Sequence, residues 1–263
     1  MKIKFDMNKK NIILLSTATS LIVGSCVGYS ALNKYLEDKA FKEEQARILE
    51  MEREIQAKEE ARIERIKNNK VAYLTFDDGP HKERTERILD ILDKNNIKAT
   101  FFMLGQEVEK YPEIVKKIYD KGHTIANHST NHKYNYPTKE SYIEDIKTTD
   151  KLISEAIGTE YKSLYVRVPG GSFGKQHVKE AIAEDGRIDL NWTALNGDAE
   201  KKTKDSKDAM MNKLKETFGD DKYEVVLMHD IKELTVESLQ EIIDYIKSEG
   251  YIFEPLVSDS PVI

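Results

Sequence analysis

The sequence is poor in cysteine and has no surplus of positive charge. Cys26 is the single cysteine among 263 residues, so no internal disulfide can form. Lysine and arginine number 41 against 47 acidic residues, which gives a formal net charge of -6. No basic patch with interleaved aromatic residues appears, so the sequence gives no reason to expect nucleic acid as a partner. The six histidines are few enough that their grouping is informative.

Charged side chains are absent from residues 11–33. About 20 apolar residues suffice to span a bilayer, so this run predicts a transmembrane segment. Four lysines precede it, which predicts that residues 1–10 form a cytoplasmic basic N-terminus and that the rest of the chain is extracellular. Two kinds of membrane anchor are compatible with this sequence. The length of the run favours an uncleaved, single-pass signal anchor, whereas residues 23–26 resemble a lipoprotein signal in which Cys26 is lipidated. Either would attach the chain to the cell membrane.

Glycine and proline are absent from residues 34–69, which are rich in Glu, Lys, Arg, Ala and Gln. This composition favours a helix and predicts a charged helical spacer over residues 34–70. At 1.5 Å per residue, such a helix would hold the next domain about 50 Å from the bilayer. Ile48 and Ile55 lie seven residues apart, so weak self-association through this helix is an alternative to a single spacer helix.

Residues 71–263 alternate regularly between strand-like runs and amphipathic helical stretches, which predicts one domain with a parallel sheet, either open and doubly wound or closed as a barrel. The seven strand-like runs are Val71–Phe76, Lys98–Met103, His123–Asn127, Leu164–Val168, Ile188–Leu195, Glu224–His229 and Tyr251–Leu256. The helical stretches are Glu86–Lys94, Pro112–Asp120, Lys139–Ile157, His177–Glu184, Lys207–Phe218 and Val236–Ser248.

Polar side chains stand at or just past the C-terminal ends of these predicted strands. They are Asp77, Asp78, His128, Arg167, Asp198 and His229. In a parallel βα architecture this edge of the sheet is where active sites are built. The common position predicts that the domain is an enzyme.

Two adjacent carboxylates, Asp77 and Asp78, follow an apolar strand and precede the turn at Gly79-Pro80. Side by side they repel one another unless a bound cation compensates, although ordinary turn chemistry would also explain them. His128 and His132 have the i, i+4 spacing of a divalent metal site, or are two exposed loop histidines. With Asp78 as a third ligand, the set would leave open positions for water and substrate.

Four motifs in order resemble those of the polysaccharide deacetylases, the NodB-homology or carbohydrate esterase family 4 group, and in particular membrane-anchored bacterial peptidoglycan N-acetylglucosamine deacetylases. They are Thr75–Pro80 (TFDDGP), His128–His132 (HSTNH), Arg167–Gly171 (RVPGG) and Leu227–His229 (LMH). The resemblance extends over residues 71–263. It implies an α/β fold of the distorted (β/α)7–8 barrel type and metal-dependent removal of N-acetyl groups from sugars.

The resemblance also implies a role for each matching residue. Asp77 would be the general base, Arg167 would keep it in place and ionised, and His229 would be the acid that protonates the departing nitrogen. The implied cofactor is one divalent metal ion, usually Zn²⁺, with Co²⁺, Ni²⁺ or Mn²⁺ as alternatives, and its ligands would be Asp78, His128 and His132.

The substrate side of the resemblance is less complete. A backbone N–H near Gly170 would stabilise the oxyanion, and Leu227 would line the pocket for the acetyl methyl group. Asp198 corresponds to the family aspartate that tunes the catalytic histidine, but the tryptophan that usually follows it is replaced by Ala199. An aromatic residue is also common where Gly170 stands, and Trp192 is predicted to belong to the core.

These departures affect the prediction of the substrate more than the prediction of the reaction. An outward-facing domain beside the membrane faces the cell wall, which favours peptidoglycan as the acetylated glycan. Poly-N-acetylglucosamine, chitin oligomers or xylan are alternatives of the same class. A catalytically inactive glycan-binding surface protein is the alternative from another class.

Overall fold

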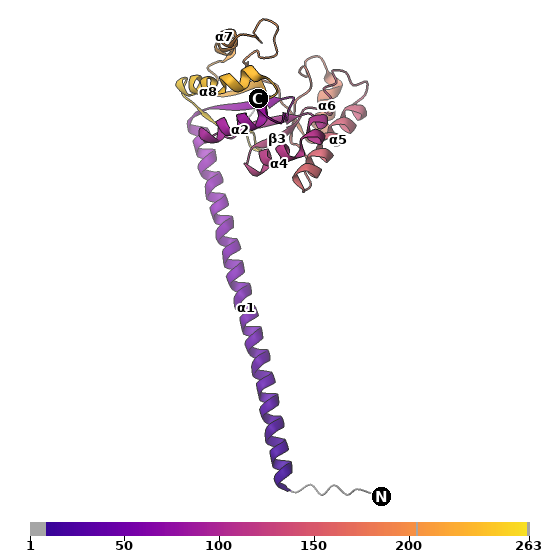
Figure 1. Cartoon of the computed structure of the whole chain (residues 1–263), viewed down its shortest axis with the longest axis vertical. Coiled ribbons are helices and arrows are strands. Elements are labelled where there is room, and N and C mark those ends of the chain that lie inside the picture. Colours follow the sequence, from indigo (N-terminus) through magenta and orange to yellow (C-terminus); the bar gives the residue numbers. More distant parts are fainter. Residues whose placement is uncertain (1–8, 204, 262–263) are drawn as a thin grey trace. The chain divides into compact units, whose positions relative to one another are not determined.

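The computed structural model describes residues 9–203 and 205–261, and it describes side chains from residue 34 onward. The chain divides into two units between Lys67 and Asn68. Helix α1 (Lys9–Asn68) makes up the first unit and is one uninterrupted helix in Figure 1. A helix over residues 34–68 agrees with the prediction from composition.

The side chains of residues 34–61 of α1 are exposed, including Phe41, Ile48 and Ile55, which lie seven residues apart. Self-association through these residues stays a prediction. Among the residues whose side chains are described, no helix combines the length and apolar character that crossing a membrane requires. The predicted anchor, residues 11–33, lies outside those residues.

The second unit is built on a sheet of eight parallel strands with β1 (Lys70–Asp77) in its middle. One edge of β1 pairs along its length with β7 (Tyr223–His229). The other edge pairs first with β8 (Tyr251–Phe253) and then with β2 (Thr100–Met103). The remaining strands are β3 (Thr124–Asn127), β4 (Tyr165–Val166), β5 (Ile188–Asp189) and β6 (Ala194–Leu195).

The strand order β5-β4-β3-β2-β1-β7-β6 leaves β5 and β6 as the two ends of the sheet, and they do not pair with each other within the described residues. The sheet is therefore a curled half-barrel rather than a closed barrel. This order agrees with a distorted barrel and excludes the doubly wound alternative, because the helices of such a fold would cover both faces of an open sheet.

Helices pack against the sheet, where their apolar side chains form hydrophobic clusters with alternate side chains of the strands. They are α2 (Arg84–Lys94), α3 (Gly105–Lys110), α4 (Pro112–Asp120), α5 (Lys139–Ile157), α6 (Gln176–Glu184), α7 (Lys207–Thr217) and α8 (Glu233–Ser248). Because strand side chains alternate, Ala72, Leu74 and Phe76 of β1 enter the main hydrophobic core with residues of α2 and α8. Thr75 and Asp77 point to the inner face, where the candidate site lies. Helix α3 was not among the predicted helices.

The predicted strand Ile188–Leu195 is wrong as a single element, because β5 and β6 are separated by residues 190–193. The cause is a buried side chain from another strand end. Arg167 donates from Nε to the Leu190 carbonyl at 3.0 Å and from Nη2 to the Asn191 carbonyl at 3.3 Å. Because these two carbonyl groups accept hydrogen bonds from Arg167, they are not available to a neighbouring strand, and the strand is interrupted there.

Candidate active site

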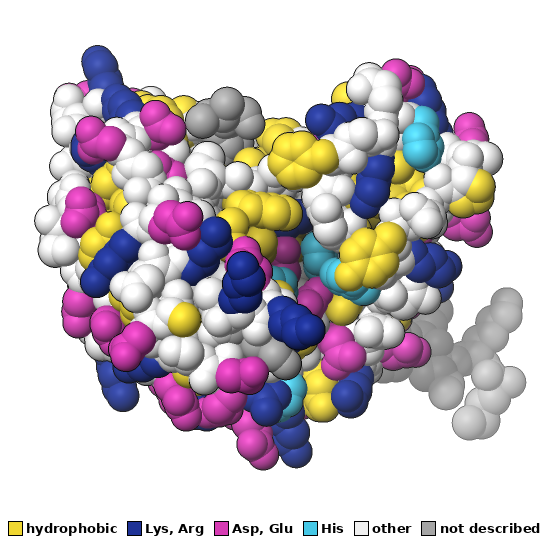
Figure 2. Space-filling view, turned by 90° about the horizontal axis from the view of Figure 1, so that it is seen from above, with side chains coloured by type: hydrophobic (Ala, Val, Ile, Leu, Met, Phe, Trp, Pro, Cys, Tyr) yellow, Lys and Arg dark blue, Asp and Glu magenta, His cyan; other side chains and the backbone are white. Residues whose placement is uncertain are grey.

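The C-terminal ends of the strands surround a cavity of about 440 Å³. Asp77 at the end of β1 is in register with His229 at the end of β7, and His128 directly follows β3. Figure 2 shows histidine and acidic side chains inside a hollow with hydrophobic side chains at its rim. The lining residues are Asp77, Asp78, His128, His132, Tyr134, Val168, Gly170, Trp192, Ala199, Leu227, His229 and Lys232.

Seven of the nine predicted site residues line this cavity, including Gly170 and Leu227, which were predicted to contact substrate. Arg167 and Asp198 do not line it. They lie behind Asp77 and His229, respectively, and hold these two side chains. The structure therefore brings the whole predicted set into one place.

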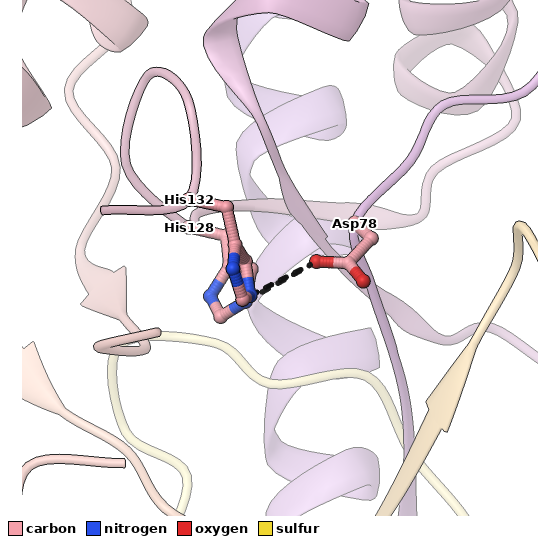
Figure 3. A group of neighbouring side chains, drawn as sticks. All are labelled: Asp78, His128 and His132. Carbon is pink, nitrogen blue, oxygen red and sulfur yellow. Dashed lines mark ion pairs between the residues drawn. The ribbon is translucent and has the colours of Figure 1, made fainter. Parts of the chain in front are cut away.

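Asp78, His128 and His132 form a three-residue group in which the ligand atoms all lie within 4.8 Å of one another. The Asp78 Oδ1 atom is 3.5 Å from His128 Nε2 and 3.4 Å from His132 Nε2, and Figure 3 shows both rings directed at this carboxylate. Asp78 and His132 have φ angles of 74° and 56°, in the left-handed region. Non-glycine residues in this region are strained, and such strain is concentrated at functional sites.

The donor atoms of this group suit a divalent metal ion. His128 Nδ1 donates to the Arg167 carbonyl oxygen at 2.8 Å, so the neutral ring has its lone pair on Nε2, which faces Asp78. Burial lowers the pKa of His128, which favours the neutral form that binds metal. Asp78 Oδ1 is buried and accepts no hydrogen bond from the described residues. A bound metal ion would give this carboxylate oxygen a partner, so the three side chains are suited to bind a divalent metal ion.

Asp77 is held from behind by Arg167. The carboxylate is 2 % exposed and its Oδ1 accepts from Arg167 Nη1 at 2.7 Å, while the arginine is fully buried. Arg167 Nη1 also donates to Thr75 Oγ1 at 2.9 Å, and its guanidinium carbon lies 4.0 Å from the centre of the Phe102 ring. The other carboxylate oxygen of Asp77, Oδ2, is 3.7 Å from His128 Nε2. One oxygen of Asp77 is thus paired, and the other faces the metal group.

His229 is held from behind by Asp198. The His229 Nδ1 donates to Asp198 Oδ1 at 2.7 Å, and the His229 backbone N–H donates to Asp198 Oδ2 at 2.8 Å. Thr235 Oγ1 donates to the same Oδ2 at 2.5 Å. Burial opposes a charge on His229, but the hydrogen bond and negative charge of Asp198 outweigh burial and raise the pKa of His229 to about 9. Burial would likewise raise the pKa of Asp198, yet His229 and Thr235 hold it below its usual value.

Several residues of the cavity were missed or misplaced by the sequence analysis. Trp192 is not a core residue of a strand. It is half-buried, lines the cavity and lies against Arg167. Tyr134 and Lys232 also line the cavity, and the Lys232 Nζ forms no hydrogen bond or ion pair with any described residue. Their positions, two residues after His132 and three after His229, were the signal that could have identified them.

Asp230, next to His229, was also missed. It is 1 % exposed, and its Oδ2 accepts from Thr85 Oγ1 at 2.5 Å. A Cβ atom at Gly79 would overlap the Asp230 carboxylate, so only glycine allows this side chain to lie beneath the turn that carries Asp78. Burial raises the pKa of Asp230 to about 7. Asp230 thus supports the turn from the inside.

Comparisons with known proteins agree with this geometry. A family model described as polysaccharide deacetylase matches residues 64–186. A peptidoglycan-N-acetylglucosamine deacetylase of Bacillus cereus is 34 % identical over 199 residues, which are 74 % of this chain and 72 % of that protein. The chain belongs to the polysaccharide deacetylase family.

Two further relatives show how far the similarity extends. The peptidoglycan-N-acetylglucosamine deacetylase of Listeria monocytogenes is 33 % identical over 193 residues, which are 73 % of this chain but only 39 % of that longer protein. The crystal structure of the catalytic domain of a peptidoglycan N-acetylglucosamine deacetylase from Eubacterium rectale matches with a TM-score of 0.66 and 33 % identity. It covers 74 % of this chain and 92 % of that domain. The half-barrel unit is therefore the part shared with the family.

Proposed function

We propose that this chain is a metal-dependent hydrolase that removes N-acetyl groups from N-acetylglucosamine-type residues of cell-wall glycan, with peptidoglycan as the substrate. The observation that carries the proposal is the placement of a carboxylate, Asp77, and a protonated imidazole, His229, at the same cavity as the Asp78, His128 and His132 group. A hydrolytic base, an acid and a metal site in one cavity are the parts that amide hydrolysis requires.

The metal would be held by Asp78, His128 and His132, and we propose Zn²⁺ because two imidazoles and one carboxylate match its catalytic sites. Co²⁺, Ni²⁺ and Mn²⁺ are the alternatives. When bound, such an ion would polarise the amide carbonyl and lower the pKa of a water to about 7.

The residues of the chain would move the two protons of the reaction. Asp77 Oδ2 faces the metal group and would accept a proton from the water that attacks the acyl carbon, while Arg167 holds the carboxylate in place through its other oxygen. With a pKa of about 9, His229 is protonated at neutral pH and can donate its Nε2 proton to the sugar nitrogen as the C–N bond breaks. The products are acetate and an amino sugar.

The cell-wall substrate and the location belong to the same proposal. The support comes from the names of the relatives and from the lysine-flanked apolar run at residues 11–33. This run would attach the chain to the membrane with the deacetylase unit outside the cell, and the charged part of α1, residues 34–68, would separate the two.

The test is acetate release by the full chain loaded with Zn²⁺, with peptidoglycan and N-acetylglucosamine oligomers as substrates and chelator-treated protein as the control. We expect Asp78→Ala to lose bound metal and turnover together. Absence of acetate from every glycan, with metal bound at one equivalent, would refute the enzymatic proposal and leave a glycan-binding protein. Release from chitin oligomers or xylan but not from peptidoglycan would refute only the choice of substrate.

A further inference from the structure

The turn at Gly170-Gly171 lies between two aromatic rings. Both glycines have positive φ angles, 70° and 79°. A Cβ atom at Gly170 would be 3.0 Å from Tyr134 Cε1, and a Cβ atom at Gly171 would be 2.9 Å from Phe173 Cδ2. The missing side chains therefore let one ring approach each side of the turn. The aromatic residue common at position 170 in the family is absent, but aromatic side chains from two other positions occupy its surroundings.

Both rings are unusually exposed for their size. Phe173 is 70 % exposed and Tyr134 is 58 % exposed. Among the described residues of the half-barrel unit, the only other exposed large hydrophobic side chain is Tyr119, on α4. Exposed aromatic side chains that gather beside a cavity mark a surface that a ligand covers. Tyr134 lies at the metal end, with its ring centre 5.0 Å from that of His132.

A second cavity of about 250 Å³ adjoins the catalytic one and shares Trp192 with it. It lies at the seam where β5 and β6 fail to pair, because residues 189–193 cross this gap. Phe173 and Trp192 form one wall, with their rings edge to face at 6.5 Å. The second cavity therefore shares one aromatic side chain with the catalytic cavity and has an aromatic wall.

The second cavity also contains hydrogen-bonding groups. Asp189 Oδ1 is buried and has no hydrogen-bond partner among the described residues, and burial raises the pKa of this carboxyl. The Asn191 amide is oriented by a bond from its Nδ2 to Ser172 Oγ at 3.0 Å. A pyranose ring has an apolar face of C–H groups and an edge of hydroxyl groups. An aromatic wall beside a carboxyl and an amide matches both.

We propose that Phe173 and Trp192 form a second carbohydrate subsite, which binds the sugar unit next to the one that is deacetylated. The contribution of Phe173 and Trp192 to binding is then larger for a glycan chain of several sugars than for a single sugar. This inference rests on the proposed function, because it assumes that the neighbouring cavity acts on a sugar. It also explains how the chain can lack the aromatic residues usual at positions 170 and 199.

The experiment compares N-acetylglucosamine oligomers of increasing length, free of peptide, with the full metal-loaded chain and its Phe173→Ala variant. Phe173→Ala removes an aromatic surface that a bound sugar would cover, which should raise KM for the pentamer about tenfold. The loss should grow with chain length, so the ratio of kcat/KM for the pentamer to that for the single sugar falls. Phe173→Trp keeps an aromatic ring at this position, so its ratio should stay close to that of the wild-type chain. Tyr119→Ala is the matched control, because Tyr119 is an exposed aromatic residue that lines neither cavity, and it should leave the ratio as it is.

A binding measurement separates this inference from the proposed function. Calorimetric titration of Asp77→Asn protein with the pentamer, with and without Phe173→Ala, requires no turnover and should show weaker binding in the double variant. Equal pentamer affinity in both would overturn the subsite even if acetate is released. An effect of Phe173→Ala on peptidoglycan but not on peptide-free oligomers would assign the surface to the stem peptide and would also overturn it. Absence of acetate release would count against the proposed function alone.

Discussion

Two buried ion pairs lie behind the cavity, and they are oriented in opposite senses. In the Asp77–Arg167 pair the arginine is buried behind, and the carboxylate faces the metal group. In the Asp198–His229 pair the carboxylate is buried behind, and the imidazole faces the cavity. The same kind of contact, 2.7 Å in both cases, thus presents an anion on one side and a cation on the other.

The opposite orientations arise because β1 ends at the carboxylate of its pair, Asp77, whereas β7 ends at the imidazole of its pair, His229. An ionised carboxylate at the cavity is available to accept a proton, and the always-charged arginine cannot take that proton away. A protonated histidine at the cavity is available to donate a proton, and the buried Asp198 raises the pKa of His229 to about 9. The two orientations therefore divide the work of base and acid between the ends of β1 and β7.

The largest effect is expected from Asp77→Asn, which keeps the shape of the side chain and removes the base. We expect kcat for acetate release to fall by about 10²–10⁴-fold, because that is the usual contribution of a positioned proton acceptor. Zinc content, measured by elemental analysis, should stay at the wild-type value because Asp77 is not a proposed ligand. Turnover at the wild-type rate would show that another group acts as the base.

The next effect is on stability and concerns Arg167→Met. Asp77 would then be a buried carboxylate without its partner, and breaking such a pair costs about 3–5 kcal/mol in the free energy of unfolding. Chemical denaturation of the variant measures this loss. The Arg187–Asp150 pair, 2.6 Å apart and also buried, provides the control, and Arg187 has a second partner in Asp185 at 2.6 Å. Arg187→Met should lose similar stability but keep more of the turnover, so equal losses of turnover would mean that Arg167 has only a structural role.

The sequence predicted the alternation of strands and helices well, because it depends on local hydrophobic patterns. It failed between β5 and β6, where a strand of eight residues was expected at Ile188–Leu195. There, the backbone carbonyl groups of Leu190 and Asn191 accept hydrogen bonds from Arg167. A partner 23 residues away in the chain decides the local structure. No pattern within residues 188–195 carries that information.

The candidate site shows the same division. The proposed metal ligands and the acid and base side chains stand at strand ends, and the periodic position of these ends made them recognisable in the sequence. Tyr134, Phe173 and Trp192 lie in loops, where their position depends on backbone conformation and not on periodicity. The Gly170-Gly171 turn leaves room for the rings of Tyr134 and Phe173, and its positive φ angles are not specified by any residue pattern. The aromatic surroundings of the cavity therefore required the structure.

A third prediction concerns pH and the His229 side of the comparison. The proposed acid must be protonated, so wild-type activity should decline as the pH rises through about 9, the pKa of His229. In Asp198→Asn the negative charge that raises this pKa is lost, while burial, which lowers it, remains. The alkaline limb of the kcat profile should therefore move down toward the ordinary value of 6.5. Asp77 also raises the pKa of His229, but by less than Asp198 does, so Asp77→Asn should move the limb in the same direction by a smaller amount. An unmoved limb in Asp198→Asn would show that His229 does not set it.

The smallest effects are expected from the two threonine hydroxyls that support the pairs. Thr75 Oγ1 accepts from Arg167, and Thr235 Oγ1 donates to Asp198. Replacing either with valine keeps the shape, removes one hydrogen bond to a charged group and should cost about 1.5–3 kcal/mol in the free energy of unfolding.

The two variants should differ in their pH profiles. Asp198 without the Thr235 hydroxyl still accepts both N–H groups of His229 and attracts its proton more strongly, so Thr235→Val should move the alkaline limb slightly upward. Thr75→Val acts on the other pair and should leave that limb in place. Identical pH profiles, measured on acetate release, would mean that the Thr235 hydroxyl does not act on the pKa of His229 through Asp198.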